Sequence, residues 1–259
     1  MIIDAHHVTE HKVRLKLMTT IRDALIIVRG DFRADKLKLL WALAFAIVFM
    51  GYISIFSGMI LDDVLESGDG KVLADILLLS MTPMLGVTFS RRTMKYLSED
   101  SYTRMLAYMR SLPVPVAVIL CKRKLHTLFS LSLNGVLLFG LIYAMSGQIR
   151  SELTIPAYLS FALIWTGFAL VMSGLYTFIE LLVSGKIYFC LLLLIVLLCM
   201  GAALLVWEFG GNLFLYSLHN AKEWGLASPL MWSTLLLGTV SVQLFSKWTI
   251  YRLKSRDLV

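Results

Sequence analysis

The sequence predicts an all-α integral membrane protein with six transmembrane helices, an amphipathic N-terminal helix and a further amphipathic helix in a long cytoplasmic loop. Hydrophobic residues make up 58% of the 259 residues and charged residues only 16%, whereas soluble domains average about 45–50% and about 25%. Apolar runs of membrane-spanning length recur along the chain, and the basic residues gather in alternate connections between them. The net charge of +7 therefore reflects membrane topology, and we expect no nucleic-acid partner.

The first 38 residues form a cytoplasmic segment. From His11 to Lys38, basic and apolar side chains recur at roughly helical spacing, which predicts an amphipathic helix on the membrane surface. The alternative is a solvated basic arm, and the regular recurrence of the apolar residues argues against it. The first apolar run begins near Leu39, too far along the chain for a cleavable signal, so we expect none.

Six apolar runs form a membrane domain at residues 39–247, and each is near or above the ~17–25 residues that a spanning helix needs. Thr82 and Pro83 predict a kink or a locally unwound turn in the second run, which we interpret as packing geometry. The apolar segment 208–225 predicts one or two short interfacial or re-entrant helices. The six runs cover about Leu39–Leu61, Val72–Ser90, Leu125–Ser146, Ile155–Val183, Ile187–Trp207 and Ser228–Phe245.

The distribution of lysine and arginine predicts the topology. Of the 24 basic residues, 21 lie before the first run, in the loop of residues 91–124, at Lys186, or after the sixth run, where residues 248–259 form a basic tail. The other side carries the acidic cluster around Asp62 and Asp69. The positive-inside rule then places both termini in the cytoplasm. We therefore expect a multi-pass protein of the cell membrane.

A short amphipathic helix is predicted at about residues 98–112. Ser98 is a suitable N-cap, Glu99 and Asp100 place negative charge on the first turn, and Pro113 ends the helix. One face of the helix carries apolar residues at a spacing of three and four positions: Tyr102, Met105, Leu106, Met109 and Leu112. Arg104 and Arg110 lie outside this face. Such a helix either rests on the bilayer surface or docks on a soluble partner.

Few residues inside the apolar runs have polar or ionisable side chains that could bind a ligand or take part in a reaction. The cysteines and histidines lack metal-ligand spacing and no Walker A pattern occurs, so we expect no metal and no cofactor on this chain. Asn134 lies mid-way along the third run, where it either contacts a solute in the transport path or, more commonly, packs helices together. We expect Asp75 and Glu180, near the ends of their runs, to anchor the structure, with Glu180 pairing for example with Lys186.

The assembled pattern resembles the permease subunit of ABC type-2 exporters. The resemblance rests on six spans with cytoplasmic termini, the amphipathic N-terminal helix and the loop between the second and third spans, and it extends to the basic tail. The loop residues that carry it are Glu99, Asp100, Arg110, Ser111, Leu112, Pro113 and Lys122 to Lys124. The outer loops are short, unlike those of members with a large extracellular domain, which leaves small-molecule, peptide or lipid-linked substrates open.

The resemblance implies that residues 98–112 are a coupling helix that docks into a separate ABC ATPase subunit, which would bind the ATP. It also implies that two permease chains, identical or related paralogues, pair around the transport path, with the N-terminal helix near the ATPase. The expected coupling residues are Glu99, Asp100, Tyr102, Arg104, Met105, Leu106, Met109 and Arg110. The chain itself would then not be an enzyme.

The main alternative is a secondary transporter or channel that works without ATP. Such a transporter should show internal repeats and broken helices with polar residues at mid-membrane. Apart from Thr82, Pro83 and Asn134, the sequence lacks these signs. A membrane-embedded enzyme or a purely structural anchor is a more distant alternative.

Overall fold

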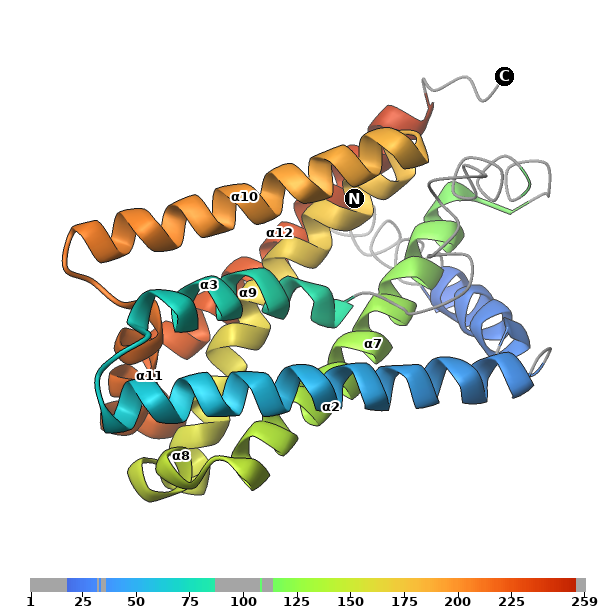
Figure 1. Ribbon diagram of the computed structural model, residues 1–259. Helices are drawn as coiled ribbons and strands as arrows, with labels where there is room; N and C mark the ends of the chain where they lie inside the picture. Colours follow the sequence, from blue (N-terminus) through green and yellow to red (C-terminus); the bar gives the residue numbers. More distant parts are fainter. Residues whose placement is uncertain (1–17, 32, 34–35, 87–107, 109–113, 255–259) are drawn as a thin grey trace, which may run out of the picture.

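The computed structural model describes residues 18–31, 33, 36–86, 108 and 114–254, and within these ranges it contains helices and no strand. Figure 1 shows long helices that run across the molecule, with shorter ones gathered at one end. Residues 18–31 are helical. The further elements are α2 (Lys36–Glu66), α3 (Lys71–Met81), η1 (Thr82–Gly86), α7 (Val116–Met145), α8 (Gly147–Glu152), α9 (Ile155–Leu182), α10 (Gly185–Glu208), α11 (Leu213–Trp224), η2 (Gly225–Ala227) and α12 (Pro229–Lys254).

Five of the described helices, α2, α7, α9, α10 and α12, are long and apolar enough to cross a membrane. They correspond to the first, third, fourth, fifth and sixth predicted spans. The helical class is thereby confirmed for the described residues, and five apolar helices of this length are consistent with a multi-pass membrane protein. The second predicted span, Val72–Ser90, is described only as far as Gly86, as the 11-residue helix α3 and the turn η1. Six spans therefore stay a prediction.

The predicted irregularity in the second apolar run is confirmed. The α-helical hydrogen bonding of α3 ends at Met81, and the chain continues from Thr82 to Gly86 as a 3₁₀ helix. Pro83 has no backbone N–H to continue the α-helix. The Thr82 hydroxyl donates to the carbonyl of Leu78 one turn earlier, which satisfies the hydroxyl where water is absent.

The short helix predicted within residues 208–225 is also present, as α11. Gly210 before it has a φ of 73° and Gly225 after it a φ of 49°, which are angles that favour glycine because a Cβ crowds the backbone there. The Asn212 side chain caps α11 by accepting from the N–H of Leu215 at 2.8 Å. The chain can thus reverse direction before and after α11, which places α11 against the ends of the long helices.

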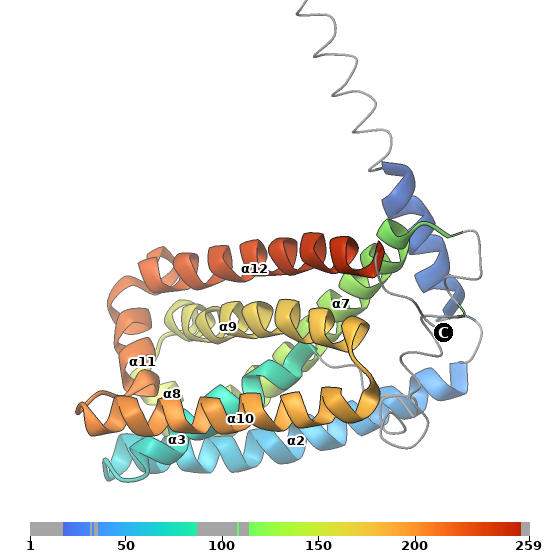
Figure 2. The ribbon, with the colours of Figure 1, turned by 90° about the horizontal axis from the view of Figure 1, so that it is seen from above.

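The most extensive contact between helices in the described chain joins α9 and α12, and Figure 2 shows the two helices side by side. A Cβ on Gly238 of α12 would lie 2.7 Å from the carbonyl oxygen of Gly167 on α9, and a Cβ on Gly167 would lie 2.7 Å from the backbone of Thr234. Such small residues let two membrane helices approach closely and gain van der Waals contact. The Ser241 hydroxyl adds a 3.1 Å hydrogen bond to the carbonyl of Val171.

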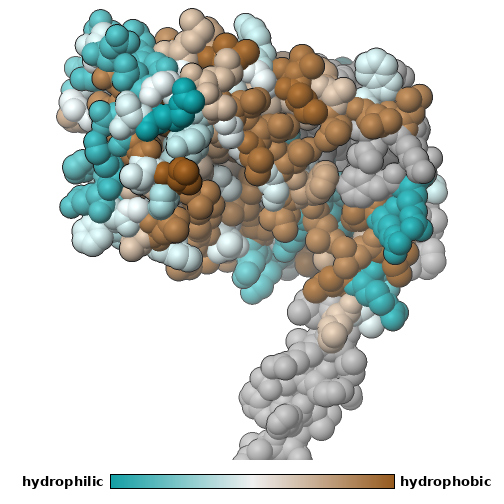
Figure 3. Space-filling model, turned by 90° about the horizontal axis from the view of Figure 1, so that it is seen from below, coloured by the Kyte–Doolittle hydropathy of each residue, from teal (hydrophilic) through white to brown (hydrophobic). Residues whose placement is uncertain are grey.

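The two ends of the long helices differ in charge, and apolar side chains occupy much of the surface between them (Figure 3). We define the acidic end as the α2–α3 turn, with Asp62, Asp63, Glu66 and Asp69, together with α8 and α11. We define the basic end as the start of α7, with Lys122, Arg123 and Lys124, and the adjoining ends of α9 and α12. This separation is the pattern that the positive-inside rule describes.

Two helices extend beyond the limits that we predicted for their spans. Helix α7 begins at Val116, so the basic cluster lies inside its first turns instead of before it. Helix α12 continues past residue 247 to Lys254, into the segment assigned to the tail. The reason is packing, because Leu253 is buried against Leu120 of α7 and Leu181 of α9. Hydropathy alone does not detect such contacts.

We predict that Gly238→Ala destabilises the protein by about 1–3 kcal/mol, the usual cost of overpacking a close contact, because the added methyl group would collide with Gly167 and Leu170. The matched control is Gly140→Ala on α7, where a Cβ meets no atom within 4 Å and replacing a helical glycine is expected to stabilise by about 0.5–1 kcal/mol. Thermal unfolding in detergent measures both. Equal stability of the two variants would contradict the close approach of α9 and α12.

Candidate functional site

Ion pairs join three helices at the basic end. Arg123 on α7 contacts Glu180 on α9, with Nη2 2.5 Å from Oε2. The neighbouring Lys122 lies 2.7 Å from Asp31 of the N-terminal helix, and His126 lies 3.6 Å from the same carboxylate. The start of α7 is thereby tied to the N-terminal helix on one side and to α9 on the other.

Glu180 was expected to be an anchoring residue, and the structure places it in a buried ion pair between two helices. Its side chain is only 3% exposed, and a buried carboxylate is stable only when it is paired. The partner, however, is Arg123, which lies 57 positions earlier in the chain, and not Lys186, which we gave as the example. A pair between residues so distant in sequence cannot be derived from spacing.

Asn134, the second expected polar residue, packs helices together. It is buried on α7, and its Nδ2 donates to the carbonyl of Leu85 in η1 at 3.0 Å. This bond satisfies a carbonyl that the break in the second apolar run withdraws from α-helical pairing. Asn134 and Glu180 do not form one site, because Asn134 lies about 16 Å along α7 from Arg123, the partner of Glu180.

At the acidic end, Asp75 on α3 holds the beginning of α11. Its carboxylate is fully buried and accepts the backbone N–H groups of Leu213 at 2.8 Å and Phe214 at 2.7 Å. These N–H groups have no partner within their own helix, and the dipole of α11 favours a negative charge at this position. Anchoring by Asp75, expected from the sequence, is confirmed, and its partner is the short helix α11.

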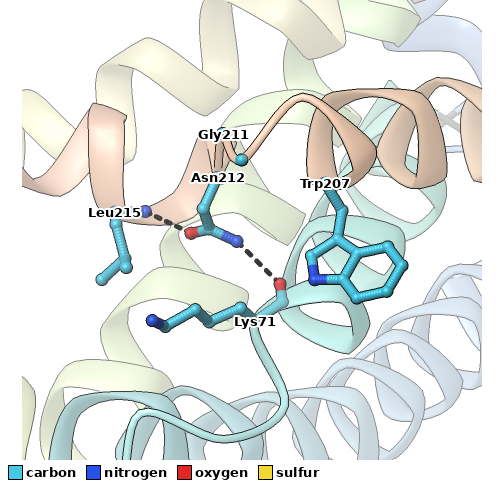
Figure 4. Close-up of a pocket in the computed structure, with 6 residues that line it drawn as sticks. Lys71, Trp207, Gly211, Asn212 and Leu215 are labelled. Carbon is cyan, nitrogen blue, oxygen red and sulfur yellow. Dashed lines mark hydrogen bonds between the residues drawn. The ribbon is translucent and has the colours of Figure 1, made fainter.

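Next to this contact lies a cavity of about 380 Å³, shown in Figure 4. Asn212 links its two sides, since Nδ2 donates to the carbonyl of Lys71 at 2.8 Å while Oδ1 caps α11. The cavity offers one ammonium group and one indole, and no pair of groups suited to acid–base or nucleophilic chemistry. Its lining residues are Lys71, Trp207, Gly210, Gly211, Asn212 and Leu215.

Further bonds close the acidic end. The Ser146 hydroxyl donates to Asp62, which joins the end of α7 to α2, and its oxygen accepts from the N–H of Ile149 at the start of α8. Lys222 on α11 lies 2.5 Å from Glu152 on α8. Within the described ranges, no three His, Cys, Asp or Glu side chains are arranged to hold a metal ion.

All eight coupling residues expected from the sequence lie outside the described part of the chain. These are Glu99, Asp100, Tyr102, Arg104, Met105, Leu106, Met109 and Arg110. Sequence reasoning missed the roles of Asp31 and Arg123. The basic run 122–124 was a usable signal, because such a run needs acidic partners, which Asp31 and Glu180 supply. Comparisons of the chain with protein-family models, curated proteins and solved structures gave no match. Its own geometry is therefore the basis for proposing a function.

We predict that Arg123→Gln destabilises the protein by about 3–5 kcal/mol, because it leaves the Glu180 carboxylate buried without a charge partner. Adding Glu180→Gln should recover most of this loss, since two neutral amides need no counter-charge. Thermal unfolding of the two variants, with the wild type as reference, measures the effect. If the double variant is no more stable than Arg123→Gln alone, the ion pair does not account for the packing of α7 on α9.

We predict that Asp75→Ala frees the start of α11, because two buried backbone N–H groups lose their acceptor. The cost is about 1–3 kcal/mol for each unsatisfied group. Hydrogen exchange at Leu213 and Phe214 should speed up, whereas Asp69→Ala, on the exposed α2–α3 turn, should leave it unchanged. Unaltered exchange in Asp75→Ala would refute the capping role.

Proposed function

We propose that this chain is the membrane permease subunit of an ATP-driven ABC exporter, coupled to a separate ATPase subunit. In this proposal it lies in the cell membrane with both termini in the cytoplasm, and it pairs with a second permease chain, either a copy of itself or a related paralogue, around the transport path. The proposal is supported by five helices of membrane-spanning length and by the resemblance carried in the loop between the second and third predicted spans.

The observation that carries the proposal is the network of ion pairs at the start of α7. The proposed coupling helix at 98–112 precedes α7, which begins at Val116. Within its first turns α7 is fixed to Asp31 through Lys122 and to Glu180 through Arg123. A displacement of the coupling helix would therefore pass directly to the N-terminal helix, to α7 and to α9, as coupling of ATP hydrolysis to transport requires.

An ATP-independent secondary transporter is the second candidate, and one observation favours it. The second apolar run breaks at Thr82 within the helical bundle, and the polar side chain of Asn134 satisfies a carbonyl of the broken segment. Broken helices of this kind form substrate or ion sites in several transporter folds. The break also has a purely structural explanation, since Pro83 ends the helix, so it supports this candidate less than the ion pairs support the first.

We predict that Met105→Asp weakens recovery of the ATPase with the permease and uncouples ATP hydrolysis from transport, while expression and membrane insertion stay normal. The change places a charge in the centre of the apolar stripe that the ATPase would bury. Arg104→Glu should act in the same direction, since losing one member of a buried charge pair costs about 2–5 kcal/mol. Tyr102→Ala should do so as well, and both effects should be smaller than that of Met105→Asp. Co-purification and ATP-driven transport are the measurements.

The control is Lys95→Glu, which removes a positive charge before the proposed helix and should be mild, because an exposed charge contributes about 1 kcal/mol or less. If the three helix variants bind the ATPase and transport normally, residues 98–112 rest on the lipid surface instead. If the wild-type chain transports its solute without any ATPase, the secondary transporter replaces the exporter.

A further inference from the structure

The helix at residues 18–31 has two faces of different character. Ala24 is fully buried and Asp31, seven positions later, forms the ion pair with Lys122, so this face lies against the protein. Positions seven apart lie on the same side of a helix. The opposite face presents Met18 and Leu25, whose side chains are 68% and 49% exposed.

Two arginines accompany these exposed apolar residues. Arg22 and Arg29 are again seven positions apart, and both are exposed. By helical spacing they lie on the same outward side as Met18 and Leu25. An amphipathic helix with large apolar residues and flanking arginines is typical of the interface between lipid headgroups and acyl chains.

The charged residues on and near this helix indicate that the lipid in contact with it is anionic. At the start of α7, Lys122 pairs with Asp31 and Arg123 pairs with Glu180. Lys124 makes no ion pair among the residues that the structure describes. Arg22 and Arg29, which are exposed on the outward face, are the basic residues that would attract an anionic membrane surface.

The apolar surface continues from this helix onto α2. Leu37, Leu40 and Trp41, at the beginning of α2, are all more than half exposed, and α2 is one of the five helices of membrane-spanning length. Lipid acyl chains cover the apolar surface of such a helix. Because residues 18–31 and the beginning of α2 follow each other along the chain, the same membrane leaflet would cover the apolar surface of both.

We propose that the outward face of residues 18–31, with Met18, Arg22, Leu25 and Arg29, is a binding surface for anionic phospholipid headgroups. The ion pair between Asp31 and Lys122 fixes the helix on α7 so that this face is presented to the leaflet. The arginines contact the lipid phosphates, and the apolar side chains enter the region of the acyl chains. Lipid binding by this surface requires no ATPase.

The test uses the full purified chain in uncharged detergent micelles that contain dioleoyl phosphatidylcholine. Dioleoyl phosphatidylglycerol is titrated in, and the midpoint of thermal unfolding is followed, because a ligand that binds only the folded state raises it. The wild type should show a saturable rise. The double variant Arg22→Gln/Arg29→Gln should bind phosphatidylglycerol about 25-fold more weakly, at about a fivefold loss for each basic residue.

The matched control removes the same charge from the acidic end, as Lys71→Gln/Lys222→Gln, and should respond to phosphatidylglycerol as the wild type does. Inorganic phosphate at the same concentration should produce no rise, because it cannot contact the apolar residues. An equal response of the two double variants would overturn the proposal. So would an equal rise with inorganic phosphate, which would indicate a site for the free anion.

A protein partner is the competing occupant of this face, and the same variants identify it. If Arg22→Gln/Arg29→Gln lowers recovery of the ATPase while the response to phosphatidylglycerol is unchanged, the face binds the ATPase and the lipid proposal is wrong. Since lipid binding is measured without ATPase or ATP, failure of the exporter proposal does not change the result expected here.

Discussion

The close approach of α9 and α12 is the contact on which the rest of the structure depends. Among the five membrane-length helices α9 has the most buried apolar window, and it also supplies Trp165, whose Nε1 donates to Ser217 of α11 at 3.2 Å, and Glu180, the partner of Arg123. In a bilayer, apolar side chains gain little from leaving lipid, so helices associate through van der Waals contact and hydrogen bonds. Glycine at 167 and 238 removes the side chains that would otherwise hold the two backbones apart.

The two ends of the bundle are closed by different physical means. At the acidic end, backbone groups at helix termini bind side chains, as in the contacts of Asp75 with α11 and of Ser146 with α8. At the basic end the bonds join charged side chains, and Asp31 is half exposed. Salt screens exposed charges much more than buried hydrogen bonds. Salt therefore weakens the exposed pairs Asp31–Lys122 at the basic end and Glu152–Lys222 at the acidic end more than the buried contacts of Glu180 and Asp75.

The sequence was sufficient for the helical class, for five membrane-length helices and for the break at Thr82, because hydropathy and proline act locally along the chain. It also indicated that Asn134 and Asp75 are structural, since polar groups at depth must find partners. It was insufficient for the identity of those partners. Glu180 pairs with Arg123, and Asp75 caps α11, because the fold brings distant segments together. The eight coupling residues expected at 99–110 lie outside the described ranges, so they stay predictions.

Helix α7 connects nearly every element that the proposals involve. Lys122 contacts the N-terminal helix, Arg123 contacts α9, Asn134 contacts η1, and the carbonyl of Leu138 accepts the Ser54 hydroxyl of α2 at 3.2 Å. A helix with intact internal hydrogen bonds moves as a stiff unit, because bending it requires breaking the i to i+4 pattern. A force applied near Val116 would therefore reach α2, η1 and α9 together. This is the arrangement that the proposed coupling of ATP hydrolysis to transport would use.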